Sequence, residues 1–206
     1  MSIGKKAVKI IVSKLLKKAQ ILIMLSLLIG CETPTNTQRW PEVTFAHLPP
    51  ITLDVANIQL VNKQRTSEKF SQIMYRLPIS PAMGLRQWAR DRLRSGGQSG
   101  SAQFIIQNIS VTKTALIQDK SLKGVFTKQQ SDRYDFQITA NLEVISDLTG
   151  ERGQAFASAR RSITIREDLS LNDRERALFE AVNQLLQDFN NGMQTAIDKH
   201  LVAWTL

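Results

Sequence analysis

Residues 132–146 read DRYDFQITANLEVIS, and their alternating pattern is the clearest structural signal in the chain. Every second position carries an apolar or small side chain: Tyr134, Phe136, Ile138, Ala140, Leu142 and Val144. The positions between them are polar: Asp135, Gln137, Thr139, Asn141 and Glu143. Successive side chains of a strand point to opposite faces of a sheet. The stretch therefore predicts a strand with one buried and one solvated face, which is typical of antiparallel sheets.

Two more strands flank this one in the chain. The segment 102–117, AQFIIQNISVTKTALI, is rich in β-branched residues and predicts a long strand. The segment 147–150, DLTG, predicts a hairpin turn into a partner strand over 153–167. On that strand Ala155, Ala157 and Ala159 share one face with Ile163 and Ile165. The three small side chains leave room for a helix, or for an apolar groove, on the buried face.

The first strand is expected at 51–62, ITLDVANIQLVN. Its apolar side chains change from one parity to the other near Ala56 and Asn57. A bulge at that point would reconcile the two frames.

Two helices complete the pattern. Ser80 and Pro81 predict a helix start, and SGG at 95–97 predicts its end. Its apolar stripe is formed by Leu85, Trp88, Ala89 and Leu93. Asn172, with Glu175 three residues on, predicts the start of a second helix that runs to about Leu201. Its stripe is formed by Leu178, Val182, Leu185, Phe189, Met193 and Ile197, and NNG at 190–192 is expected to soften or bend it.

The element order is strand, helix, three strands, helix. Two helices with apolar stripes and a sheet with one apolar face predict an α+β fold, a two-layer sandwich with a mainly antiparallel four-stranded sheet (βαβββα). We expect this single domain to cover 51–206.

The N-terminal segment has the layout of a secretory signal peptide. Residues 1–30 contain six lysines and no acidic residue. The lysines all lie before residue 19, and an apolar run follows them over 21–30. That run is shorter than the about 20 residues of a spanning helix. Without these six of the 27 basic residues, 21 basic and 18 acidic residues remain. The net charge of +9 is thus mostly that of the segment, and nucleic acid is not an expected partner.

The segment Leu28-Ile29-Gly30-Cys31 resembles the lipobox of bacterial lipoproteins. The resemblance implies cleavage between Gly30 and Cys31 and acylation of the Cys31 thiol, with two or three chains that give stable anchoring. The alternatives are an uncleaved anchor and a buried thiol. Cys31 is the only cysteine, so a lipidated chain would form no disulfide and no thiolate metal site.

Residues 31–50 contain four of the six prolines and predict an extended tether after the lipidated cysteine. We expect its aromatic residues, Trp40 and Phe45, to pack on the domain rather than on the bilayer. Glu32 follows the cysteine, where an aspartate in similar lipoproteins often retains the protein in the inner membrane. Glutamate favours the periplasmic face of the outer membrane, with the inner membrane as the alternative.

Two basic regions are candidates for contacts. The connection 118–131 contains Lys120, Lys123, Val125, Phe126 and Lys128, a composition that suits contact with a membrane or partner. The alternative is a loop folded back on the sheet edge. Arg86, Arg90 and Arg94 recur every four residues on the first helix, and the functional interpretation of this basic face is contact with anionic headgroups. The alternative, which is favoured, is a solvated face paired with Asp91.

No residue pattern indicates catalysis, a cofactor or a metal. His47 and His200 have no neighbours in the sequence suited to a triad or a metal set. The acid pairs Asp132/Asp135 and Asp168/Asp173 lie at expected element ends, where solvated carboxylates are ordinary. We therefore expect no enzymatic activity.

The element order resembles that of the lipopolysaccharide-assembly lipoprotein and of the auxiliary lipoproteins of ABC-type lipid transporters. The stretches SPAMGLRQWARDRLRSGG, SDRYDF and AFASARRS are similar to those of uncharacterised Gram-negative lipoproteins. The second resemblance implies no activity and no functional residue beyond Cys31. Together with the lipobox and the lack of a catalytic pattern, we expect a membrane-anchored, non-enzymatic module that binds another envelope protein. A lipid-handling component of an envelope transporter or assembly system is the alternative.

Overall fold

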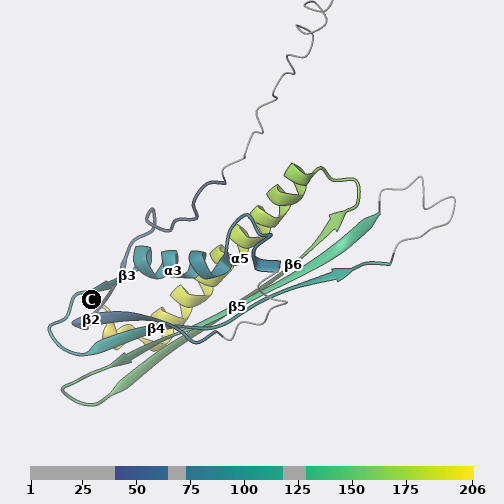
Figure 1. The fold of residues 1–206 in the computed structure, drawn as a ribbon. Helices are drawn as coiled ribbons and strands as arrows, with labels where there is room; N and C mark the ends of the chain where they lie inside the picture. Colours follow the sequence, from purple (N-terminus) through teal and green to yellow (C-terminus); the bar gives the residue numbers. More distant parts are fainter. Residues whose placement is uncertain (1–39, 65–72, 118–128) are drawn as a thin grey trace, which may run out of the picture. The chain divides into compact units, whose positions relative to one another are not determined.

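Residues 132–145 lie in β5 (Gln130–Ile145), a central strand of the main sheet. The computed structural model describes residues 40–64, 73–117 and 129–206 (Figure 1). The other strands are β1 (Ile51–Leu53), β2 (Asn57–Asn62), β3 (Leu93–Ser95), β4 (Ser101–Ala115) and β6 (Arg152–Arg166). The helices are α3 (Pro81–Arg92) and α5 (Leu171–His200), and a 3₁₀ turn, η1, covers Val202–Trp204.

The main sheet has the strand order β2-β4-β5-β6. β5 pairs antiparallel with β4 and with β6, whereas β2 pairs parallel with β4. α3 and α5 lie on the same side of this sheet (Figure 1). The predicted fold class, an α+β sandwich with a mainly antiparallel four-stranded sheet and two helices, is confirmed.

The alternation along β5 is confirmed on the inner face, where Tyr134, Phe136, Ile138, Ala140, Leu142 and Val144 are all buried. The prediction of a wet outer face is wrong at two positions, since Thr139 and Asn141 are buried as well. Asn141 lies between Ile105 of β4 and Phe156 of β6. A short side chain on a central strand is covered by longer neighbours on both sides, which a single strand's sequence does not reveal.

The expected bulged strand over 51–62 is wrong. The chain turns at 54–56 and forms two strands, β1 in a small parallel sheet with β3, and β2 in the main sheet. The turn is held from two sides: the Asp54 amide donates to the Trp204 carbonyl (2.8 Å), and the Ala56 amide donates to the Ser99 carbonyl (3.1 Å). The parity change in the sequence marks this turn rather than a bulge, and Val55 at its centre is fully buried.

α3 begins at Pro81 as predicted, but the helix ends at Arg92 and not at the SGG segment. Leu93 is buried as expected of the apolar stripe, yet it is the first residue of β3. The reason is that Ile51, Thr52 and Leu53 of β1 pair with residues 93–95. Tertiary pairing overrides the helical spacing of the sequence.

α5 begins at Leu171, one residue before the predicted Asn172. Ser170 is its N-cap, and the Ser170 hydroxyl accepts a hydrogen bond from the Asp173 amide (3.1 Å). The helix is continuous through NNG at 190–192, so these residues do not interrupt it. Asn190 points into the core, where it accepts a hydrogen bond from the Trp88 indole.

The core lies between the sheet and the two helices. Ala155, Ala157 and Ala159 are buried under α5, so the helix, and not an open groove, occupies the space they leave. Gly84 lets α3 approach α5, because a Cβ atom there would clash with the Leu186 side chain. The Trp204 ring packs closely on Gly153 of β6, because a Cβ atom on Gly153 would lie 2.6 Å from the ring nitrogen.

Residues 40–50 belong to the compact unit, which extends from Arg39 to Leu206 and so starts before residue 51. Phe45 is fully buried in the core, and Val43 and Leu48 pack against it. Trp40 stacks on Phe179 of α5 with 5.0 Å between the ring centroids. The prediction that Trp40 and Phe45 pack on the domain is confirmed.

Candidate binding surfaces

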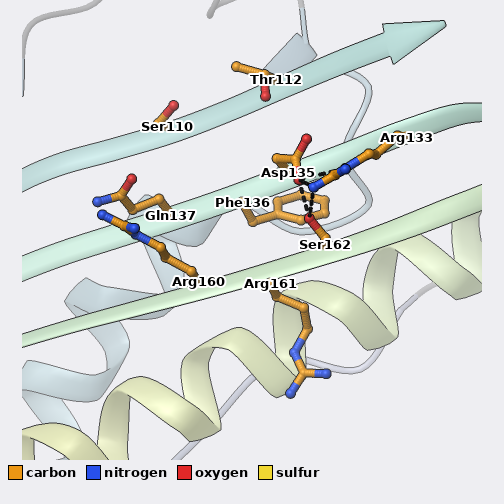
Figure 2. Close-up of a pocket in the computed structure, with 9 residues that line it drawn as sticks. All are labelled: Ser110, Thr112, Arg133, Asp135, Phe136, Gln137, Arg160, Arg161 and Ser162. Atoms are coloured by element: carbon orange, nitrogen blue, oxygen red, sulfur yellow. Dashed lines mark hydrogen bonds and ion pairs between the residues drawn. The ribbon is translucent and has the colours of Figure 1, made fainter. Parts of the chain in front are cut away.

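The outer face of the main sheet carries a polar hollow of about 460 Å³ over β4, β5 and β6. We call it the sheet hollow (Figure 2). Its polar lining is formed by Ser110, Thr112, Arg133, Asp135, Gln137, Arg160 and Ser162. In the part of the chain that the structure describes, both helices lie on the opposite face, which leaves this face of the sheet uncovered by a helix.

Asp135 is the centre of a small network in the sheet hollow. Arg133 donates to the Asp135 carboxylate through Nε (3.0 Å) and Nη2 (2.8 Å), and the Ser162 hydroxyl donates to the same oxygen. The hydrogen bonds from Ser162 and Arg133 lower the pKa of Asp135 below its ordinary value, against the opposing effect of burial. Asp135 is therefore ionised and orients Arg133 and Ser162 along the sheet surface.

The rest of the sheet hollow is open to hydrogen bonding. Gln137 and Arg160 lie opposite each other in the β5–β6 register, and their side chains extend toward each other in Figure 2. Arg161 points to the other side of the sheet, where it pairs with Asp188 of α5 at 2.8 Å. The surface thus offers two guanidinium groups, one carboxylate and several hydroxyls, which suits a polar partner of mixed charge.

A second hollow, of about 600 Å³, lies beside α3, and we call it the α3 groove. Residues 40–43 form part of its lining, together with a segment before α3 that includes Tyr75 and Leu77. Met83, Gly84, Gln87 and Arg90 of α3 complete the lining. The lining is largely apolar and aromatic, with Glu42 and Arg90 as its charged members.

Residues 40–50 are attached to α3 by Asp91. One Asp91 carboxylate oxygen accepts hydrogen bonds from the Phe45 amide (2.7 Å) and the Thr44 hydroxyl (3.0 Å), and the other accepts from Gln87 (2.7 Å). Burial raises the pKa of Asp91, but these hydrogen bonds outweigh burial and hold the pKa below its ordinary value. We call this contact the Asp91 clasp.

The three arginines predicted to form one face do not stay together. Arg90 is exposed on α3 and donates to Gln87 (2.6 Å), and Arg86 is half-buried one turn earlier. Arg94 lies beyond the helix in β3 and donates back to the Leu93 carbonyl (2.8 Å) and to the Arg90 carbonyl. The prediction that Arg94 shares a helical face with Arg86 and Arg90 is wrong because α3 ends at Arg92.

The acid pairs are separated as well. Asp132 lies on the inner side, where it binds Lys113 (3.1 Å) and Arg174 (3.2 Å), while Asp135 lies in the sheet hollow. Asp168 pairs with Arg166, and Asp173 takes part in the cap of α5. Among residues 40–64, 73–117 and 129–206, no group of three or more His, Cys, Asp and Glu side chains has a geometry that suits a metal ion.

Several predicted residues lie outside the described parts of the chain. These are the cleavage and lipidation residues Gly30 and Cys31, and the loop residues Lys120, Lys123, Val125, Phe126 and Lys128. Within the described parts, no helix is both long and apolar enough to cross a membrane.

Sequence reasoning predicted a solvated face of the sheet but not the hollow in it, and it missed the whole α3 groove. The alternation of polar residues at 133, 135 and 137 already pointed to an exposed polar face. The α3 groove had no comparable signal, because its lining comes from segments that show no periodicity.

No family model matches the sequence, and no curated protein is significantly similar to it. The solved structures that are similar to the chain include three lipoproteins. The rare lipoprotein B from Shewanella oneidensis is 12% identical, with 69% of this chain and 97% of that chain covered and a TM-score of 0.34. A minor lipoprotein from Acinetobacter baumannii is 12% identical, with 72% of this chain and 96% of that chain covered and a TM-score of 0.35. The uncharacterized lipoprotein B from Nitrosomonas europaea is 10% identical, with 78% of this chain and 91% of that chain covered and a TM-score of 0.38. These similar structures are lipoproteins of Gram-negative bacteria.

Proposed function

We propose that this chain is an envelope lipoprotein, anchored by acyl chains on Cys31, whose domain is a non-enzymatic binding or assembly module. The proposed location is the periplasmic face of the outer membrane. The lipobox-like segment at 28–31 supports the anchor. The observation that carries the binding role is the sheet hollow, a polar concavity of about 460 Å³ on a sheet face that no described helix covers.

The chemistry of the sheet hollow favours a protein partner over an acyl chain. Its surface presents charges of both signs and hydroxyl groups, and burying these without hydrogen bonds would cost free energy. A protein surface can satisfy them, and the polar rims of protein interfaces have such a composition. The 118–131 loop, with Lys123 and Phe126, is proposed as a further contact for the same partner.

The partner role is tested by site-specific photo-crosslinking of the full chain in cells. A photoreactive residue replaces Thr112 in the sheet hollow or, as the control, exposed Glu180 on α5. We expect a discrete protein adduct from position 112 that Arg160→Glu abolishes, and none from position 180. Equal adducts at both positions, or an adduct insensitive to Arg160→Glu, would overturn the assignment.

The anchor is tested separately. Cys31→Ser should abolish acylation and move the chain out of the membrane pellet. An unchanged membrane pellet would favour an uncleaved anchor over lipidation.

The alternative role, lipid handling, is favoured by one observation, the largely apolar α3 groove of about 600 Å³. The groove first expected over Ala155, Ala157 and Ala159 cannot serve, because α5 covers these residues. A photoreactive residue at Met83 in the Cys31→Ser chain, which is expected to leave the membrane, tests this alternative. A lipid mass instead of a protein mass in its crosslinked adducts would support lipid handling.

A further inference from the structure

The α3 groove exposes large apolar side chains. Tyr75 is 90% exposed and Met83 is 65% exposed, and both line the groove. The exposure of apolar area costs about 25 cal/mol per Å² relative to burial, so this face gains free energy when it is covered. Tyrosine in particular is enriched at membrane–water interfaces, where its ring and its hydroxyl are both satisfied.

Cations lie beside these apolar side chains. Arg90 lines the α3 groove, and Arg86 precedes it by one helical turn. The acidic residues nearby are Glu42, in the lining, and Asp91, whose carboxylate is engaged by the Asp91 clasp. Apolar groups flanked by arginines are the composition of surfaces that lie on anionic bilayers.

The chain length brings this face within reach of the anchor. Trp40 lines the α3 groove and follows Cys31 by nine residues. Nine residues span about 30 Å at most. Trp40 itself is fixed to the domain by its stack on Phe179. A lipid on Cys31 therefore tethers the domain at a short distance from the α3 groove.

We infer that the α3 groove is a membrane-docking surface. Tyr75 and Met83 enter the headgroup region of the leaflet that holds the Cys31 lipid, and Arg86 and Arg90 bind anionic lipid phosphates. This inference rests on the proposed lipidation of Cys31. It gives the domain a defined orientation, since the sheet hollow lies on other elements and remains available for a partner.

The test uses the full lipidated chain in vesicles of phosphatidylcholine with phosphatidylglycerol. Acylation occupies the thiol of Cys31, the only native cysteine, so Met83→Cys creates a single reactive site for an environment-sensitive fluorophore. Leu148→Cys is the matched control, because Leu148 is an exposed apolar residue in the β5–β6 turn. Labelling precedes reconstitution, and lipids with a nitroxide quencher report contact with the bilayer.

We expect blue-shifted emission at position 83 and quenching several-fold stronger than at position 148. Arg86→Gln with Arg90→Gln should remove the difference in quenching between anionic and pure phosphatidylcholine vesicles. Equal emission and quenching at both positions would overturn the inference. It would also be overturned if the arginine substitutions left the quenching at position 83 unchanged.

Mass spectrometry of the Cys31 peptide distinguishes failure of the docking surface from failure of the lipid anchor. An acylated peptide with no signal at position 83 refutes the docking surface alone. A peptide without acyl chains refutes the proposed anchor.

Discussion

The indole nitrogen of Trp88 donates a hydrogen bond to the side-chain oxygen of Asn190 over 2.9 Å, inside the core. The two residues are 102 positions apart in the chain and join α3 to α5. Trp88 also packs against Phe104 and Phe189, with ring centroids 5.2 and 5.5 Å away. One residue thus links both helices and β4.

Removing the acceptor should destabilise the domain. Asn190→Leu leaves the buried indole N–H without a partner, and we expect a loss of about 2 kcal/mol in the free energy of unfolding. Urea denaturation measures the loss. In a Trp88→Phe background the same substitution should cost clearly less, because no donor remains. Equal costs in both backgrounds would show that the hydrogen bond does not carry the effect.

Two helical glycines should respond in opposite ways to alanine. Gly84→Ala drives a methyl group into Leu186 and should cost about 1–3 kcal/mol through overpacking. Gly192→Ala places its methyl 3.8 Å from the Ala157 methyl, an ordinary contact, and should be neutral or stabilise by up to about 1 kcal/mol. Thermal unfolding of both variants gives the comparison. A loss at Gly192 as large as that at Gly84 would contradict the packing described for α3 and α5.

The Asp91 clasp should weaken in acid. The pKa of Asp91 is lower in the folded chain than its ordinary value of 3.8, so its ionised form stabilises the fold above that pH. This stability is lost as the pH falls through the folded-state pKa. Asp91→Asn should therefore cost about 1 kcal/mol at neutral pH and progressively less below about pH 4. Urea denaturation at several pH values checks this, and a cost that stays constant at every pH would refute it.

Asn141 is a buried polar residue whose removal should be tolerated. Its amide nitrogen donates to Glu143 (2.8 Å), but its side-chain oxygen is buried and has no hydrogen-bond partner in the structure. Asn141→Val removes this oxygen and adds a β-branched side chain to a central strand, so we expect stability to rise by about 1 kcal/mol. Chemical denaturation tests the gain. A loss of stability would show that Asn141 has a role that these contacts do not reveal.

The sequence predicted the fold correctly where a strand or helix buries one regularly spaced set of its own apolar side chains. The alternation of β5 and the stripe of α5 are of this kind, and both predicted the sheet and the helix that cover the core. The pattern failed where distant segments decide the structure. Leu93 has helical spacing but pairs with Ile51 in a parallel sheet, and the turn at Val55 depends on the chain's last residues.

The candidate surfaces show the same division. The sheet hollow was visible as a polar alternation, although its depth and the network of Asp135 required the register of three strands. The α3 groove was not visible, because residues 40–43 line it with α3 only in the folded chain, where the Asp91 clasp holds the adjoining Thr44 and Phe45.

The burial of Phe45 also has a mechanical consequence. Phe45 is fixed by the core around its ring and by the bond from its amide to Asp91. A pull on the chain before Trp40 would therefore load the Trp40–Phe179 stack first, then the Asp91 clasp and the Phe45 ring, before any tension reaches the strands of the main sheet. If this part peeled away, a phenylalanine-sized void would open in the core. Resistance to force and resistance to denaturant would then depend on the same side chain.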